Sequence, residues 1–155
     1  MMMKLLFFLQ LLEAELVVKV QKEDFDIADE LKLLNLKKNN SGGCVIFIGK
    51  VREKNNDLII KSLEIEHYPI MTEKQLETIE LEALNKWPIN SSLIIHRYGK
   101  LFPGDNIVLV MTSSAHRKTS FKATEFIVEK LKTKATFWKL EETLNKKYWL
   151  KPEKN

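Results

Sequence analysis

Basic side chains gather at three points of the sequence, each directly after an apolar segment that could form a strand or a helix. The three clusters are Lys50 with Arg52, His116 with Arg117, and Lys132 with Lys134 and Lys139. A rigid scaffold can present side chains at the ends of its elements to a ligand. Taken singly, each cluster is more commonly a solvated basic loop. If the three converge, they form a pocket for an anion.

Arginine is rare in this chain: only Arg52, Arg97 and Arg117 stand among the 25 basic residues. A guanidinium offers a rigid planar fork to phosphate or carboxylate, whereas lysine offers a mobile point charge. Arg117 also lies near the predicted start of a helix, where free backbone N–H groups favour an anion. The alternative is ordinary surface placement of a few arginines.

The sequence excludes several kinds of catalytic and cofactor site. Cys44 is the only cysteine, which leaves no internal disulfide and no all-cysteine metal site. The three histidines have no cysteines nearby and show no metal-ligand spacing. No glycine-rich phosphate loop of the dinucleotide-binding or Walker type occurs. We therefore expect no metal ion and no cofactor, and we expect Cys44, within the apolar run 44–49, to be a buried, unreactive thiol.

A length of 155 residues suits one domain, and 45% apolar with 30% charged residues is typical of a globular protein. No apolar run approaches the roughly 18 residues of a membrane span. Residues 1–15 precede the predicted domain, 16–155, and are expected to be an extra strand or to reflect a start assigned too far upstream. They contain no small-residue cleavage site, so we expect a cytoplasmic protein without membrane contact.

Apolar spacing predicts the elements that position the basic clusters. Strands are expected at residues 16–20, 44–49, 62–67, 92–97 and 107–112. Helices are expected after Asp26, from a capping box of Thr72 with Gln75 to Trp87-Pro88, and over residues 120–131. This order of elements indicates an α+β, or mixed α/β, domain.

Seven short segments, taken in order, resemble one protein family. They are FIGKVR at 47–52, LEIEHYPIM at 63–71, IHRYG at 95–99, SAHR at 114–117, FKA at 121–123, LKTKA at 131–135 and FWKLE at 137–141. The combination spans roughly residues 17 to 150 and is similar to the large, catalytic subunit of molybdopterin synthase. The resemblance implies an α/β hammerhead-like domain with an antiparallel β subdomain.

The resemblance also implies an activity and its partners. The large subunit forms a homodimer, and each copy binds a small ubiquitin-like sulfur-carrier subunit, which gives a heterotetramer. The C-terminal Gly-Gly of the small subunit carries a thiocarboxylate. Two sulfurs pass from it to cyclic pyranopterin monophosphate and form the dithiolene of molybdopterin. The chain is thus expected to be a sulfurtransferase.

By position, Lys132 and Lys139 match the two catalytic lysines of the family. The substrate-binding positions are Lys50, Val51, Arg52, His116, Arg117, Lys132, Lys139, Leu140 and Glu141. They include the three clusters identified from charge alone, which favours the anion-pocket hypothesis. An acid–base role and a transient covalent role stay open for each lysine. Arg97 matches a family position too, and we interpret it as structural.

Two departures from the family pattern bear on the site. Thr136 stands where proline is common, so the approach to Phe137 is expected to be less rigid. Asn55-Asn56-Asp57 falls in the loop after Arg52 where glycine is usual, and Asn and Asp tolerate left-handed backbone. Two alternatives are a non-catalytic dimeric interaction module of the same fold and a small basic nucleic-acid-binding domain. A net charge of only +4 and aromatics that do not cluster with basic residues argue against nucleic acid.

Overall fold

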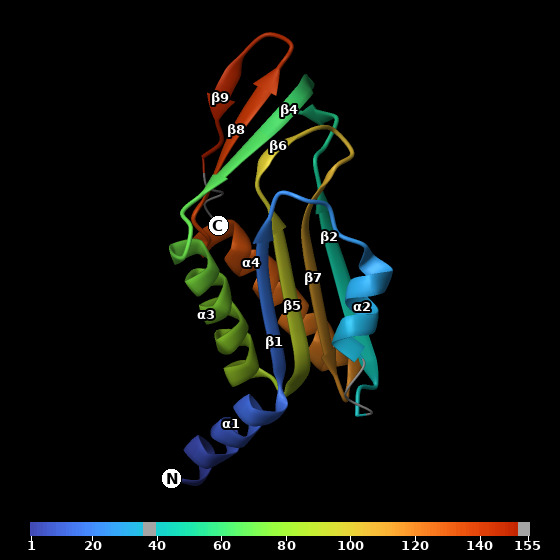
Figure 1. The fold of residues 1–155 in the computed structure, drawn as a ribbon, viewed down its shortest axis with the longest axis vertical. Helices are drawn as coiled ribbons and strands as arrows, with labels where there is room; N and C mark the ends of the chain where they lie inside the picture. Colours follow the sequence, from blue (N-terminus) through green and yellow to red (C-terminus); the bar gives the residue numbers. More distant parts are fainter. Residues whose placement is uncertain (36–39, 152–155) are drawn as a thin grey trace.

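A computed structural model describes residues 1–35 and 40–151 of the chain. The elements in order are α1 (Met2–Glu13), β1 (Glu15–Gln21), α2 (Ile27–Asn35), β2 (Gly43–Lys50), β3 (Lys54–Asn55), β4 (Leu58–His67), α3 (Met71–Lys86), β5 (Ile89–Arg97), β6 (Gly99–Leu101), β7 (Asn106–Ser114), α4 (Arg117–Lys134), β8 (Phe137–Thr143) and β9 (Lys147–Trp149). They form two sheets stacked end to end along the long axis of the molecule (Figure 1).

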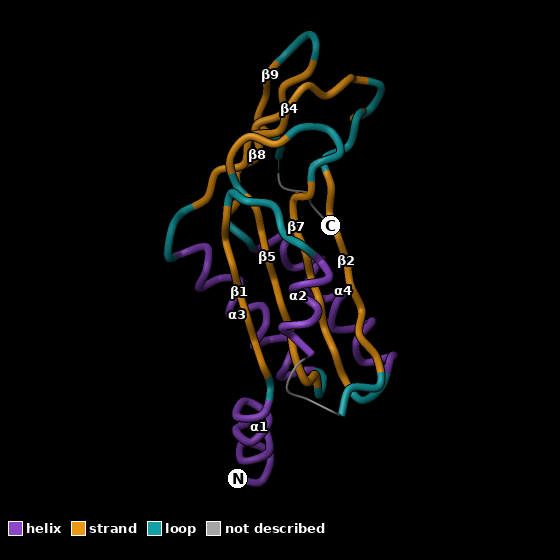
Figure 2. Tube along the Cα trace, turned by 45° about the vertical axis from the view of Figure 1, so that its right-hand side comes forward, coloured by secondary structure: helices purple, strands orange, loops and turns teal. Residues whose placement is uncertain are grey.

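The larger sheet has the strand order β1-β5-β7-β2 and is covered by helices on both faces. Only the β1–β5 pair is parallel. Successive side chains of a strand point to opposite faces, which explains the two cores. Ile94 packs with α3 and α4, whereas its neighbours Leu93 and Ile95 pack with Phe25 and Leu34 around α2. Figures 1 and 2 show α2 on one face of this sheet and α3 with α4 on the other.

The smaller sheet is antiparallel, with the order β3-β4-β8-β9 and β6 paired to β4. Its core contains Val51, Leu63, Ile65 and Leu101. Residues 56–57 form the two-residue turn between β3 and β4, with φ of 45° and 67°. Of the three residues Asn55-Asn56-Asp57, Asn56 and Asp57 adopt the expected left-handed backbone, whereas Asn55 ends β3. The predicted fold class, α+β with an antiparallel β subdomain, is confirmed as well.

Two helix predictions hold and one is wrong. Asp26 caps α2, since its Oδ1 accepts the Asp29 N–H at 3.0 Å. The helix α3 stops at Lys86, as the sequence predicts. The predicted capping box at its start is wrong: Thr72 lies inside the first turn and accepts the Tyr68 N–H, while Gln75 bonds elsewhere. These two side chains have tertiary partners that local spacing does not reveal.

The prediction that residues 44–49 form a buried strand is wrong in its burial. β2 ends the strand order of its sheet, so part of its surface has no neighbour in the described chain. Ile46 and Phe47 are 38% and 36% exposed, and Cys44 is exposed too. The apolar run reflects an edge strand with an uncovered outer side, and the thiol is not a core group.

The expected extra strand within residues 1–15 is also wrong, because most of this segment forms α1. The helix projects beyond the end of the larger sheet that lies opposite β8 and β9 (Figures 1 and 2). Its apolar side chains Leu5, Leu6, Phe8 and Leu12 are exposed. No helix in residues 1–35 or 40–151 is both long and apolar enough to cross a membrane.

Candidate functional site

A cavity of about 410 Å³ lies where α4 ends and β8 begins, and we call it the lysine cavity. Its lining residues are His96, Leu131, Lys132, Thr133, Lys134, Ala135, Thr136, Phe137, Trp138, Lys139, Leu150 and Lys151. Four lysines and a histidine are thus present, and no carboxylate is among these described lining residues. A cavity lined in this way suits an anionic ligand.

The helix end and the strand start bring Lys132 and Lys139 to one cavity. Lys132 lies in the last turn of α4, where the carbonyl end of the helix dipole favours cations. The chain turns at Ala135, enters β8 at Phe137 and pairs with β4, so that Lys139 lies opposite Ile65. Lys132 is exposed, and Lys139 is half-buried. The predicted catalytic lysines therefore line the same cavity from two different elements.

The last two turns of α4 are crowded with positive charge. Lys134 lies close enough to Lys130 to lower the pKa of that half-buried lysine. Both ammonium groups lie 3.9 Å from carboxylate oxygens of Glu82 on α3, which offsets part of the repulsion. A bound anion would offset the positive charge that remains at this end of α4.

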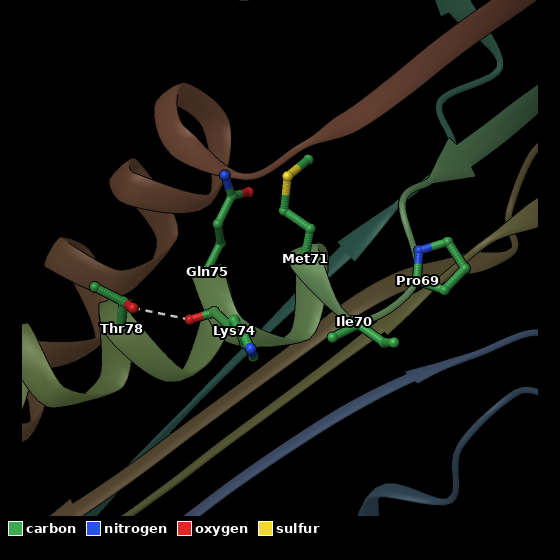
Figure 3. A pocket seen from close by; sticks show the side chains of 6 residues that line it. All are labelled: Pro69, Ile70, Met71, Lys74, Gln75 and Thr78. Atoms are coloured by element: carbon green, nitrogen blue, oxygen red, sulfur yellow. Dashed lines mark hydrogen bonds between the residues drawn. The ribbon is translucent and has the colours of Figure 1, made fainter.

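Hydrogen bonds to α3 anchor the segment that joins the two lysines. Gln75 Oε1 accepts the Thr136 backbone N–H at 2.9 Å and the Thr136 hydroxyl at 2.7 Å, and Thr72 Oγ1 lies 3.2 Å from the same hydroxyl. Figure 3 shows Gln75 projecting from α3 toward this segment, beside a shallow cavity that also contains Met71. These side-chain hydrogen bonds hold the segment that leads to Phe137, although the sequence predicts that Thr136 in place of proline makes it less rigid.

Aromatic rings form one side of the lysine cavity. The buried His96 ring stacks on Phe137 with centroids 3.6 Å apart, and His67 lies 4.3 Å from Tyr98. His96 Nδ1 lies 2.9 Å from the carbonyl oxygen of Arg97. Burial, reinforced by the nearby Lys139 charge, lowers the pKa of His96 to about 3. The ring is therefore neutral at physiological pH.

The segment 50–52 divides into an anchor and two exposed cations. Val51 is buried in the core of the smaller sheet, and its backbone bonds to Asp105 and Gly104 at 2.9 Å. Gly104 has φ of 91°, which suits the predicted turn. Lys50 and Arg52 on either side are exposed. The Val51 side chain fixes the loop, while its neighbours are free to meet a ligand.

Leu140 and Glu141 follow Lys139 on β8 and tie this strand to its surroundings. Leu140 pairs with Glu64 on one side and with Trp149 on the other. Glu141 is only 3% exposed and accepts hydrogen bonds from the Asn55 amide at 3.1 Å and from the Tyr148 hydroxyl. The bond to this carboxylate raises the pKa of Tyr148. Glu141 thus supports the strand that carries Lys139.

His116 and Arg117 lie at the opposite end of α4. With Gly42, Ala115 and Lys118 they line a separate cavity of about 440 Å³. Arg117 is the first residue of α4, and 15 residues at 1.5 Å each place it about 22 Å from Lys132 along the helix. Within one chain, this cluster and the lysine cavity do not converge.

His96, Gln75 and Lys151 belong to the site region but are not among the site residues that the sequence predicts. The alternation of β5 places His96 on the face of Ile94, toward α3 and α4, and this pattern could have identified it. Gln75 and Lys151 carry no comparable signal. Arg97, interpreted as structural, donates to the carbonyls of Lys22 and Asn106 at 3.0 Å, in agreement with that interpretation.

Comparison with known proteins identifies the family. The family model described as MoaE protein matches residues 20–134 of the chain. The chain belongs to the MoaE family. The MoaE match begins near the end of β1 and ends with α4, so it contains the other three strands of the larger sheet, β3, β4 and Lys132. No three His, Cys, Asp or Glu side chains among residues 1–35 and 40–151 group as a metal site.

Named MoaE relatives and solved structures agree with this assignment. The molybdopterin synthase catalytic subunit of Vibrio cholerae is 47% identical over 133 residues, which are 86% of this chain and 88% of the relative. The molybdopterin cofactor biosynthesis protein E of Burkholderia multivorans gives a TM-score of 0.77 at 43% identity and covers 89% of each chain. The molybdopterin synthase structure from Staphylococcus aureus gives 0.79 at 31% identity, covering 86% of this chain and 96% of that one.

Proposed function

We propose that this chain is the catalytic subunit of molybdopterin synthase and transfers two sulfurs to cyclic pyranopterin monophosphate. The observation that carries the proposal is the lysine cavity, which brings Lys132 and Lys139 together without a lining carboxylate. The relative from Vibrio cholerae carries the name of this catalytic subunit. The two alternatives, a non-catalytic module and a nucleic-acid-binding domain, have no comparable observation in their favour.

The charges of the site match the chemistry of both substrates. A thiocarboxylate and a cyclic phosphate are anions, and holding them close together requires several cations. Arg52 and Arg117 suit the phosphate because a guanidinium can donate two parallel hydrogen bonds. Lys132 and Lys139 suit the sulfur-transfer centre, where an ammonium can supply a proton and a free amine can accept one or form a transient bond.

The sulfur must come from another protein. Cys44, the only cysteine, is on β2, and no side chain from that strand lines the lysine cavity in the described chain. We assign the donor role to a small ubiquitin-like subunit whose Gly-Gly end carries a thiocarboxylate. A glycine-ended tail has no side chains at its tip, so it can enter a cavity of this size. The cavity cations would attract its terminal anion.

The arrangement of the clusters supports a homodimer within a heterotetramer. His116 and Arg117 are about 22 Å from Lys132 along α4, so they cannot hold a substrate at the lysines of their own chain. A two-fold dimer can bring this end of one copy to the lysine cavity of the other. We therefore propose that each substrate site takes its lysines from one copy and its His116-Arg117 pair from the second.

The proposal also places the reaction in the cytoplasm. A thiocarboxylate and the exposed Cys44 thiol both stay reduced in that compartment, whereas an oxidising compartment promotes disulfide formation. Fractionation of cells that produce the full chain tests this placement. Recovery of the chain with periplasmic or membrane fractions would contradict it.

The test of function is reconstitution from purified components. The chain is mixed with cyclic pyranopterin monophosphate and thiocarboxylated small subunit, and formation of the dithiolene product is followed. Small subunit with an ordinary C-terminal carboxylate is the negative control. Cys44→Ser is expected to retain activity, and a bulky residue added after the terminal glycine is expected to abolish it. Absence of product with the thiocarboxylated partner would overturn the proposal.

A further inference from the structure

His96 lines the lysine cavity but is not among the residues to which the resemblance gives a role. It lies near the end of β5, on the strand face shared with Ile94. Its ring stacks on Phe137 at an interplanar angle of 13°. Phe137 and Lys139 are two residues apart on β8, so their side chains leave the same face of that strand. His96 therefore lies under the face that carries Lys139.

The His96 ring has one defined tautomer. Nδ1 lies 2.9 Å from the Arg97 carbonyl oxygen, and a carbonyl can only accept, so Nδ1 carries the proton. Burial lowers the pKa of His96 to about 3, with further lowering by the charges of Lys139 and His67 and opposition from the Arg97 bond. Nε2 is consequently an unprotonated acceptor across the working pH range.

The other ionisable side chains among the described residues that line the cavity are all basic. Lys132 and Lys134 reach the cavity from α4, Lys151 reaches it from the segment after β9, and His67 faces His96 from β4. A charged imidazole would add to this repulsion and push Lys139 away. A neutral imidazole instead offers an acceptor in a place where donors are abundant.

We propose that His96 is a positioning residue for Lys139. Its Nε2 accepts a hydrogen bond from the Lys139 ammonium, and its stacked face holds Phe137, so that the ammonium is directed into the lysine cavity. The contact is a property of this chain alone. Its importance for sulfur transfer rests on the function proposed above.

Competitive acylation of lysine amines tests the contact without donor subunit or pterin. The folded full chain is labelled with acetic anhydride between about pH 6 and pH 11, and mass spectrometry gives the midpoint pH for each lysine. His96→Phe keeps an aromatic ring but removes the acceptor. Because the ammonium form then loses a hydrogen bond, the Lys139 midpoint should fall by about one pH unit. The exposed Lys61 serves as an internal reference.

His67→Phe is the matched control, since His67 belongs to the same aromatic group but does not line the cavity. It should leave the Lys139 midpoint unchanged. In the reconstituted reaction, His96→Phe should lower kcat about tenfold with little change in KM, as expected for lost positioning. A folded His96→Phe variant with the wild-type Lys139 midpoint overturns the proposal.

Nitrogen NMR of the wild-type chain keeps the proposal falsifiable if His96→Phe does not fold. Resonances of a protonated Nδ1 and an unprotonated, hydrogen-bonded Nε2 are expected at neutral pH. An Nε2–H tautomer, or a ring that gains a proton near pH 6, overturns the proposal. Because labelling and NMR contain no substrates, a failure there is distinct from a failure of sulfur transfer.

Discussion

Arg117 and Lys132 belong to one substrate site only if two copies of the chain share it, and subunit mixing can show this. The perturbation uses two variants, Arg117→Ala and Lys132→Ala. Each homodimer of a single variant lacks one essential group in both of its sites. Each variant alone is therefore expected to be nearly inactive with thiocarboxylated small subunit.

The recovery on mixing follows from the length of α4. With about 22 Å between the two residues along the helix, a site that uses both must take Arg117 from the opposite copy. In a mixed dimer, one site combines the intact Lys132 of one copy with the intact Arg117 of the other, while the second site lacks both. Statistical exchange makes half of all dimers mixed, so about 25% of the wild-type activity should return.

The assay measures dithiolene formation after the two variants are unfolded and refolded together, with native mass spectrometry to confirm mixed dimers. A mixture of Lys132→Ala with Lys139→Ala is the matched control, because both lysines come from one copy and no intact site can form. If mixed dimers of Arg117→Ala and Lys132→Ala form but produce no dithiolene, the shared site is refuted, and the two residues act in separate roles.

The remaining predictions concern single residues. Lys132→Ala and Lys139→Ala should each lower kcat about 10²-fold with an unchanged melting temperature, since loss of a proton-transfer group has this scale; a folded variant with full activity removes that lysine from the catalytic pair. Arg52→Lys should weaken pterin binding about tenfold by calorimetry, because the planar fork is lost, and wild-type affinity would place the phosphate elsewhere. Gln75→Leu should cost about 1–3 kcal/mol in urea unfolding and reduce kcat, because the Thr136 donors lose their acceptor, whereas Thr78→Val on the same helix should do neither. Burial raises the pKa of Glu80 well above its usual 4.5, so the unfolded chain ionises first and stability falls as pH rises above that value; the stability gain of Glu80→Gln should grow from pH 5 to pH 8, and a constant difference contradicts this.

Local patterns in the sequence predict most of the fold. The alternation over residues 62–67 locates β4, and the Asp26 cap locates α2. The failures concern partners outside the local segment. An apolar run such as 44–49 has the same composition in a buried strand and in an edge strand with an uncovered side. Thr72 and Gln75 have capping-box spacing, but Tyr68 and Thr136 compete successfully for them.

The candidate site shows the same division between local and distant information. Charge at the ends of elements, together with the family resemblance, selects the residues of all three basic clusters. Which clusters share a cavity depends on distances across the fold, and the 18-residue length of α4 separates Arg117 from Lys132. The neutral state of His96 likewise depends on burial beneath Phe137, which no local pattern encodes.

The placement of the basic clusters has a consequence for how the site is assembled. In a two-fold dimer, a contact from the start of α4 in one copy to the lysine cavity of the other is necessarily repeated in reverse. Two equivalent sites then form. In each, the phosphate-binding groups at the start of α4 come from one copy and the sulfur-transfer lysines come from the other. In an isolated chain, α4 holds the two groups at its opposite ends, so their mutual repulsion is weak until a dimer brings them together. The complete set of cations therefore forms only in the dimer, where it can bind the two anionic substrates.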